Sequence, residues 1–310
     1  MNFKKIAVVM TKDTKTESVY RKIQRFFQKF YFKQKDLAKI IIWVLNIKWP
    51  YFLSMDRTNW KFWKVNINIL TIGIVYKKIA FPIAWMLLNK RWNSNFNERK
   101  KCLQKAIKLI WKENIKWLLA DREFIWQEWF DYLLNEEIPF WIRIRNNFKL
   151  LNWKSVKIFF KWVWKKAKYI DKKITICWVE VYLTAIKVKN ELMVIASNKR
   201  WSNSINIYLK RWWIEVLFWC LKKRWFNFED THLTDYKKIS MLIWILWITF
   251  TWCHKMWEER EKQEPIKIKK HWRKAVSIFR YWLEFMQIIF FDFKRKIRDF
   301  NIAMKILSCT

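Results

Sequence analysis

Three carboxylates occupy positions from which they could act together: Asp56, Asp121 and Glu215. Asp56 and Asp121 are expected to end two strands, and Glu215 is expected to lie on a helix. Because adjacent strands lie about 4.8 Å apart, carboxylates at their ends can share hard cations such as Mg²⁺. Two such ions, about 3.5 to 4 Å apart, would activate a water or a 3′-hydroxyl for in-line attack at phosphorus. The arrangement therefore predicts metal-dependent phosphodiester chemistry.

The segment around Glu215 adds cations to the same helical face. Counted from Tyr208, the residues Arg211, Glu215 and Lys222 follow at offsets of 3, 7 and 14, which places all four within a stripe roughly 60° wide. Arg211 and Lys222 could clamp phosphates beside a metal, and Tyr208 could contact a phosphate or stack on a base.

Each acid also has an ordinary explanation when it is taken alone. An Asp at a strand end is more often a turn former, and Glu215 could simply pair with Arg211 one turn earlier on a solvated charged face. Only the combination of the three acids favours a catalytic site.

The elements that must position these acids follow from the hydrophobic periodicity. In chain order they are helices over 19–30 and 37–45 (the latter after an Asp36 cap), strands over 51–55, 64–72 and 74–81, a helix over 97–110, a strand over 117–120, a helix over 127–135, a strand over 140–145, strand-like runs over 174–179, 181–188 and 192–196, and a helix over 205–223. This is the order of an α/β ribonuclease-H-like core, in which helices flank a mixed sheet and an all-β insertion precedes the last helix.

The chain divides into three predicted parts. Residues 1–50 form a short basic helical region, residues 51–252 form the catalytic domain with its insertion at about 150–200, and residues 253–310 form a basic helical tail. The apolar run Ile239–Cys253 has about 15 residues, whereas a membrane span needs about 20. We therefore expect a buried core helix there and no membrane partner.

Charge and composition restrict the partners. The 310 residues include 63 Lys or Arg against 26 Asp or Glu, so the formal net charge is +37, which favours a polyanion and above all nucleic acid. A hydrophobic share of 53% excludes a disordered basic tail. The five cysteines are odd in number and contain no CxxC pair, which indicates a reducing cytosol and neither a disulfide framework nor a zinc knuckle.

The glycine and tryptophan contents are unusual. One glycine, Gly73, stands beside 26 tryptophans, whereas globular chains contain about 7% glycine. Tryptophan also occurs where turns would favour glycine, as at Trp92 and Trp225. We hypothesise that the gene reads UGA as glycine and that the sequence shows those codons as tryptophan. The alternative is a truly tryptophan-rich protein with many exposed indoles.

Several segments resemble the DDE transposases of insertion-sequence elements, in the branch named after insertion sequence four. The matching segments are Met55–Phe62, Leu118–Ile125, Ile142–Arg145, Phe226–Leu233, and Tyr208–Lys222, which fits the Y-xx-R-xxx-E-xxxxxx-K signature. The resemblance runs from about Ser18 to Trp252.

This resemblance implies specific roles for residues of this chain. Asp56, Asp121 and Glu215 would be the catalytic, metal-binding triad for two Mg²⁺ ions, for which Mn²⁺ can substitute. The residues implied to support DNA binding are Tyr208, Arg211, Lys222, Arg57 and Arg122. The resemblance further implies a homodimer on double-stranded transposon ends and target DNA, and a cytoplasmic, nucleoid-associated bacterial protein.

The family pattern bears on the unusual composition as well. It has glycine at four positions and favours tryptophan at four others; the first set is Trp63, Trp92, Trp126 and Trp225, and the second is Trp60, Trp85, Trp129 and Trp212. About 50 residues precede Asp56, which leaves little room for a separate DNA-binding domain, so end recognition is expected to be reduced.

The favoured function is metal-dependent cleavage and strand transfer of DNA by a transposase. One alternative is a decayed or domesticated basic DNA-binding protein, which the intact triad argues against. Another is a related ribonuclease-H-like nuclease or resolvase, which the signature from Tyr208 to Lys222 disfavours.

Overall fold

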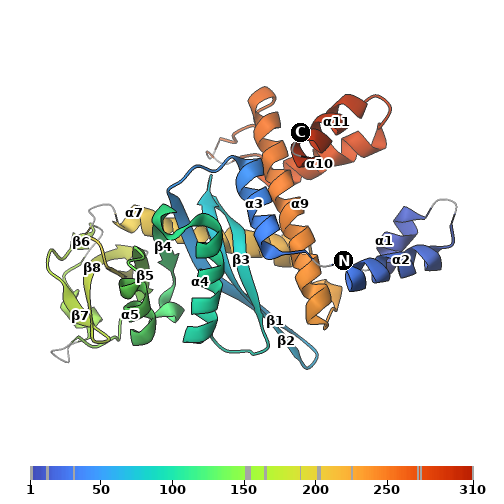
Figure 1. Ribbon diagram of the computed structural model, residues 1–310. Helices are drawn as coiled ribbons and strands as arrows, with labels where there is room; N and C mark the ends of the chain where they lie inside the picture. The colour runs from blue at the N-terminus through green and yellow to red at the C-terminus, as the bar shows by residue number, and fades with distance from the viewer. Residues whose placement is uncertain are drawn as a thin grey trace. The chain divides into compact units, whose positions relative to one another are not determined.

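A computed structural model describes residues 3–11, 14–30, 32–150, 155–163, 166–188, 190–200, 204–224, 226–270, 272 and 274–308 (Figure 1). The chain forms two compact units. One comprises Lys48–Cys220, and the other combines Met1–Ile47 with Leu221–Thr310. The second unit therefore combines the two ends of the chain, whereas the three predicted parts were successive segments of the sequence.

The first unit is built on a nine-stranded mixed sheet. Its strands are β1 (Tyr51–Phe62), β2 (Val65–Tyr76), β3 (Ile79–Leu88), β4 (Ile115–Ala120), β5 (Phe140–Ile144), β6 (Lys168–Tyr169), β7 (Ile174–Ile176), β8 (Val179–Val188) and β9 (Glu191–Ser197). The order is β3-β2-β1-β4-β5-β9-β8-β6, and β7 pairs with β8. The pairs β1/β4 and β4/β5 are parallel, and the others are antiparallel.

Helices cover both faces of this sheet around β2. Eight consecutive residues in the middle of β2 are buried, which requires cover on both faces. The helix α4 (Phe96–Ile110) packs on β2 and β3, and α8 (Trp213–Trp219) packs on β1, β2 and β3. This mixed α/β arrangement is consistent with the predicted ribonuclease-H-like core.

Two predicted helices are confirmed closely. The helix α5 spans Gln127–Asn135 as predicted, and α4 begins one residue before its predicted start. Asn95 explains that start, because its side chain accepts a hydrogen bond from the Glu98 N–H at 2.9 Å while the Glu98 carboxylate accepts one from the Asn95 N–H at 2.7 Å. This reciprocal capping box satisfies two N–H groups that a helix start otherwise leaves open.

The first three strands are longer than predicted, and the turns between them lie elsewhere. β1 continues seven residues beyond Met55, so the prediction that Asp56 ends a strand is wrong. The first hairpin turns at 63–64, between the paired residues Phe62 and Val65, and the second turns at 77–78.

Gly73 therefore lies inside β2 and not between two strands. The pairing of β2 with β3 shifts register between Ile72 and Gly73. A Cβ at position 73 would come within 3.1 Å of the Ala80 Cβ and 3.2 Å of the Phe81 carbonyl oxygen. A side chain at this position would press against the neighbouring strand, which favours glycine there.

The predicted all-β insertion is only partly β, and it joins the core sheet. It contains a helical turn, α6 (Val156–Phe159), and residues 151–154, 164–165 and 189 lie outside the described residues. β9 pairs with β5 through Trp141–Ile144 and with β8 along its full length. The insertion thus extends the core sheet.

The predicted continuous helix over 205–223 is divided into four segments. They are α7 (Ser204–Tyr208), a 3₁₀ segment η3 (Leu209–Trp212), α8, and a π-helical segment (Cys220–Arg224). Because the number of residues per turn changes between these segments, the predicted 60° stripe does not follow from ideal α-helical geometry.

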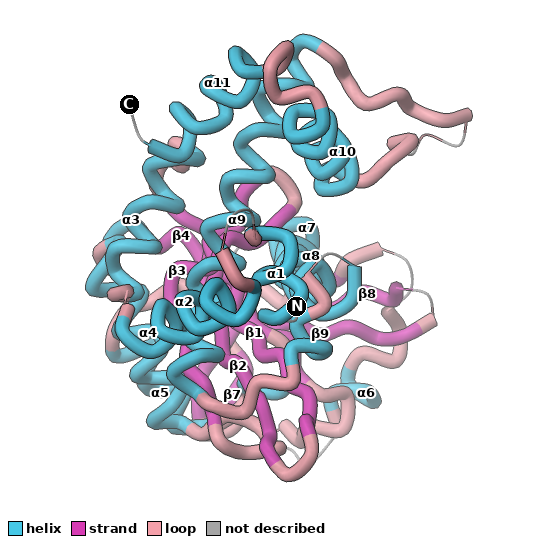
Figure 2. Tube along the Cα trace, turned by 90° about the vertical axis from the view of Figure 1, so that its right-hand side faces the viewer, coloured by secondary structure: helices cyan, strands magenta, loops and turns pink. Residues whose placement is uncertain are grey.

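The second unit is helical. Its helices are α1 (Phe3–Met10), α2 (Thr16–Lys29), α3 (Gln34–Leu45), α9 (Tyr236–Gln263), α10 (Ile278–Phe291) and α11 (Ile297–Ser308). The helix α9 contacts α2, α3, α10 and α11, and α10 also contacts α11; both are labelled near the top of Figure 2. Lys33 occupies the N-cap position of α3, and Asp36 lies in its first turn, so the predicted Asp36 cap is wrong.

The helix α9 has 28 residues, well beyond the predicted run of about 15. Within the described chain it is long and apolar enough to cross a membrane. This is weak evidence for a span, because the core helix of a soluble protein passes the same test, and 61% of its apolar window is buried. The burial agrees with the predicted core helix.

Candidate active site

Two of the three candidate acids are brought together by the parallel pairing of β1 with β4. The last paired residues of these strands are Met55 and Ala120. Asp56 and Asp121 are the next residue of each chain segment, so they stand side by side where the two strands diverge. Asp56 continues in β1, whereas Asp121 leads into a 3₁₀ turn, η2 (Arg122–Phe124), in which the Phe124 N–H donates to the Asp121 carbonyl.

Arg211 connects the third acid to this position. Its Nη1 donates to the Asp56 Oδ2 at 3.3 Å, and its Nη2 donates to the Glu215 Oε1 at 2.7 Å. The Arg211 side chain is only 4% exposed, whereas Glu215 is 54% exposed. The hydroxyl of Ser54, a buried residue of β1, donates to the Arg211 carbonyl at 3.2 Å. This contact fastens η3 to the strand that carries Asp56.

The surroundings of Asp56 oppose its ionisation. Burial is the main cause that raises the pKa of this carboxyl, and nearby Glu123 and Asp121 also raise it, while Arg211 and the hydrogen bond from the Arg57 N–H lower it; the resulting pKa is about 7. Burial alone would lower the pKa of Arg211, but Tyr208 and the three acids raise it above its ordinary value. Arg211 is therefore a permanent cation held among acids.

The donor set fits a hard divalent cation in its chemistry but is not arranged as a metal cluster. Within the part of the chain that the structure describes, no group of three or more acidic, His or Cys residues is placed to hold a metal ion. The Asp121 Oδ1 is buried and makes no hydrogen bond to any described residue. A buried carboxylate oxygen of this kind needs a partner, and a cation between Asp121 and Asp56 would supply one.

A second set of residues ties the two aspartate segments together; the sequence analysis named only Arg57 among them, and in a DNA-binding role, and missed its partners Glu123 and Asn93. The Arg57 Nε donates to both carboxylate oxygens of Glu123 at 3.0 Å, and its Nη2 donates to the Asn93 Oδ1 at 2.6 Å. Arg57 directly follows Asp56 and Glu123 lies two residues after Asp121, and their side chains are only 13% and 19% exposed. Burial raises the pKa of Glu123, against the lowering effect of Arg57 and Arg99.

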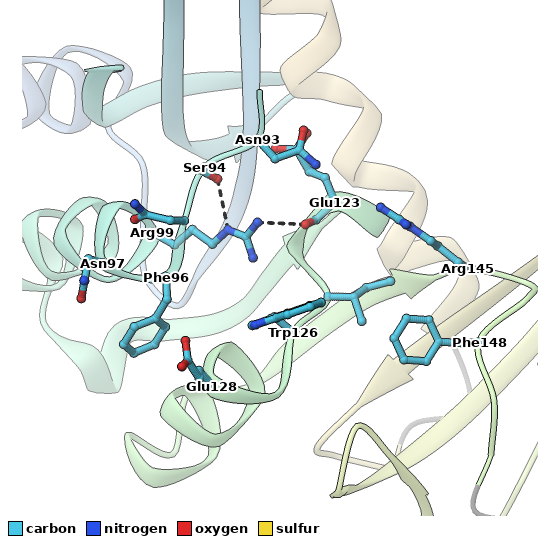
Figure 3. Close-up of a pocket in the computed structure, with 12 residues that line it drawn as sticks. Asn93, Ser94, Phe96, Asn97, Arg99, Glu123, Trp126, Glu128, Arg145 and Phe148 are labelled. Atoms are coloured by element: carbon cyan, nitrogen blue, oxygen red, sulfur yellow. Dashed lines mark hydrogen bonds between the residues drawn. The ribbon is translucent and has the colours of Figure 1, made fainter. Parts of the chain in front are cut away.

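Arg99 extends this network from the first turns of α4. Its Nε donates to the Ser94 Oγ at 3.1 Å and its Nη2 donates to the Glu123 carbonyl at 2.9 Å (Figure 3). These groups line a pocket of about 570 Å³ to which Trp126 and Arg145 also contribute. The one sequence signal was the position of Arg57 and Glu123 close to the two aspartates.

The DNA-support residues are placed differently from one another. Arg122 is exposed, so it remains a candidate for a phosphate contact. Arg57 and Arg211 are engaged with carboxylates, as described above. Tyr208 is 1% exposed and packs among Trp117, Trp141 and neighbouring apolar side chains. Burial raises the pKa of its hydroxyl. In this conformation it contributes to the core and is not accessible to a base.

Lys222 belongs to the other compact unit. Its Nζ lies 3.3 Å from the Glu229 Oε1. The structure therefore joins Arg211 and Glu215 of the predicted stripe, and Tyr208 lies beside them with its ring 6.0 Å from the Arg211 guanidinium.

Comparison with known proteins identifies one family. Residues 93–252, just over half of the chain, match the family described as Transposase DDE domain; the matched stretch contains Asp121, Arg211 and Glu215, and Asp56 precedes it. No curated protein matches the chain. Among solved structures, endonuclease V from Bacillus subtilis is similar at 10% identity over 64% of this chain and 84% of that chain, with a TM-score of 0.31. A similarity this low carries no argument.

Proposed function

This chain belongs to the transposase DDE domain family, and from that premise we propose that it is a DNA transposase that cleaves phosphodiester bonds at the ends of its element and transfers the freed 3′-hydroxyl to target DNA. The observation that carries this proposal is the adjacency of Asp56 and Asp121 beyond the last β1/β4 pair, with Glu215 joined to Asp56 through Arg211.

The proposed chemistry assigns distinct tasks to these residues. Asp56, Asp121 and Glu215 would hold divalent ions, which when bound supply nucleophile activation and charge stabilisation at phosphorus. The Arg57 N–H fixes the orientation of the Asp56 carboxylate through a 2.8 Å hydrogen bond. Arg122, which is exposed beside Asp121, would bind a DNA phosphate. The net charge of +37 supports affinity for DNA of any sequence.

The proposal also includes a fold type and a family branch, which are supported by the strand order and by the spacing of the residues around Glu215. The order β3-β2-β1-β4-β5, with three antiparallel strands followed by two parallel ones, supports a ribonuclease-H-like core. The spacing of Tyr208, Arg211, Glu215 and Lys222 supports the branch named after insertion sequence four. A homodimer on the DNA ends and a cytoplasmic, nucleoid-associated location complete the proposal.

The test is cleavage of DNA that carries the element's own terminal repeats. With Mg²⁺ or Mn²⁺ we expect nicks at the repeat ends, followed by joining to a target plasmid, and we expect chelation of the metal to stop both while leaving binding intact. Nicking that survives complete chelation would contradict the proposal. Binding without any nicking would favour the basic DNA-binding protein, and nicking without joining would favour the nuclease.

We also propose that several tryptophans of this sequence are glycines in the natural protein. Among the described residues, four tryptophans have positive φ angles of 52° to 65°, and they are 71–89% exposed: Trp63, Trp111, Trp178 and Trp272. Trp63 and Trp178 lie in two-residue hairpin turns, and Trp111 is the C-cap of α4. These are positions where glycine is strongly preferred, because a Cβ is strained there.

The burial of the other tryptophans discussed in the sequence analysis is compatible with this proposal. Trp92 and Trp126 are exposed, and Trp225 lies outside the described residues. Trp85 and Trp129, for which true tryptophan is predicted, are completely buried in the core. Of the remaining two, Trp60 is half-buried and Trp212 is 39% exposed.

Replacing the four positive-φ tryptophans by glycine should stabilise the recombinant protein by about 1 kcal/mol per site, because the left-handed strain is removed. Urea unfolding measures the change, and Trp85→Gly is the control that should destabilise. Reading the gene decides the origin of these residues: we expect UGA at the four positions and UGG at Trp85 and Trp129, and UGG at all six would refute the recoding.

A further inference from the structure

Arg211 occupies the place in the candidate site where a cation is needed. It is the side chain that contacts both Asp56 and Glu215, and it does so with two different nitrogens of one guanidinium. The chain that holds this guanidinium is itself fixed, because the Arg211 carbonyl accepts the Ser54 hydroxyl of β1. The planar fork of arginine suits this task, since it presents separate N–H groups to separate carboxylates.

The contacts of Arg211 are unequal. The bond to Glu215 is short, at 2.7 Å, whereas the bond to Asp56 is 3.3 Å. Its Nε is buried and makes no hydrogen bond to any described residue. Glu215 is half-exposed and can turn toward solvent, whereas Asp56 is held in β1, where it pairs with Thr71 of β2. Movement of the Glu215 side chain toward solvent would therefore break its contact with Arg211, while the contact between Arg211 and Asp56 remains.

We propose that Arg211 is the resident counter-ion of the metal-free site and that it must release Glu215 before this acid can bind a divalent ion. This inference rests on the proposed function. The largely buried Asp56 carboxylate would be costly without a counter-charge, so Arg211 supplies that charge until the metal arrives and holds Glu215 beside it. Once released, its guanidinium is free to bind a phosphate of the DNA, which is the role that the family resemblance implies.

The proposal predicts that metal and DNA phosphate assist each other. Both ligands favour the state in which Arg211 has left Glu215, so binding of either one lowers the cost of binding the other. If Arg211 were instead a fixed structural contact, its removal would leave metal affinity unchanged or would weaken it by disturbing Asp56.

The experiment measures Mn²⁺ binding to the full chain without DNA, from the electron paramagnetic resonance signal of free Mn²⁺. Arg211→Gln should bind Mn²⁺ about tenfold more tightly than the unchanged protein, because a competing cation among the acids is lost. The matched control is Arg200→Gln, which removes the same charge from an exposed pair with Asp171 and should leave the affinity unchanged. Equal or weaker binding by Arg211→Gln overturns the inference.

A further variant separates this inference from the proposed function. Asp56→Asn should lose Mn²⁺ binding whether or not Arg211 is also replaced. If Asp56→Asn bound Mn²⁺ as well as the unchanged protein, the metal site itself would be misassigned. If it lost binding while Arg211→Gln gained none, only the role of Arg211 would fail.

A measurement on the unchanged protein covers the case in which Arg211→Gln does not fold. With nitrogen-15 in the arginine side chains, the Arg211 guanidinium resonance is identified by its loss in Arg211→Lys, which keeps the charge. We expect it to be protected from solvent exchange without metal and to become exchangeable as Mg²⁺ saturates the site. An Arg211 resonance that stays protected at saturating Mg²⁺ overturns the inference.

Discussion

Asp121→Asn is expected to reduce cleavage of the element's ends by about a thousandfold or more, equivalent to about 4 kcal/mol of transition-state stabilisation. The substitution keeps the shape of the side chain and removes its charge. The Asp121 Oδ1 makes no hydrogen bond to the described residues, and the Asp121 charge disfavours ionisation of Asp56. We therefore expect the loss to fall on catalysis, with little change in the free energy of unfolding.

The measurement compares nicking rates and DNA affinity at one salt concentration, because affinity for DNA depends steeply on salt. Asp171→Asn is the matched control, since Asp171 is 74% exposed and pairs only with a surface arginine in the described structure. It should nick at the normal rate. Undiminished cleavage by Asp121→Asn would show that Asp121 is not a catalytic ligand.

The second large effect concerns the pair Arg57–Glu123. Glu123→Leu should lower the free energy of unfolding by about 3 kcal/mol, because it leaves the guanidinium of Arg57 buried without its carboxylate. Arg57→Met should cost a similar amount for the converse reason. The double replacement should cost much less than the sum, since two apolar side chains can pack together where an ion pair was.

Urea unfolding of the two single variants and the double variant measures this coupling. The exposed pair Arg200–Asp171 supplies the control, and its single variants should each change the free energy of unfolding by less than about 1 kcal/mol. Additive costs for Arg57→Met and Glu123→Leu would mean that the two side chains do not depend on each other.

The regular elements were predictable where the hydrophobic period was clear. The helix α5 matches its predicted range because its apolar residues repeat at helical spacing up to Asn135. The length of β1 was misjudged because its turn is formed by Trp63 and Lys64, a pair that carries no glycine or asparagine signal, and β2 was cut short because Gly73 was interpreted as a turn although it lies within the strand. If position 63 is glycine in the natural protein, the missing signal is a property of the translation and not of the fold.

The sequence was sufficient to predict which acids form the candidate site, but not which side chains contact one another there. Asp56 and Asp121 could be paired from their expected strand positions, although Asp56 proved to lie within β1. The bond between Arg57 and Glu123 joins residues 66 positions apart, and no local pattern specifies such a partner. The burial of Arg211 could not be predicted either, because spacing shows which residues share a helical face but not what that face packs against.

The element that carries Glu215 is unlike those that carry the other two acids. Asp56 is in the middle of a strand that is paired on both sides, whereas α8 is a helix of seven residues directly preceded by a 3₁₀ segment. If a residue changes from 3₁₀ winding, with three residues per turn, to α-helical winding, with 3.6, the residues that follow it rotate slightly about the helix axis. A change of winding in this segment would therefore rotate Glu215 about the helix axis, while Asp56 stays paired with Thr71 in the sheet.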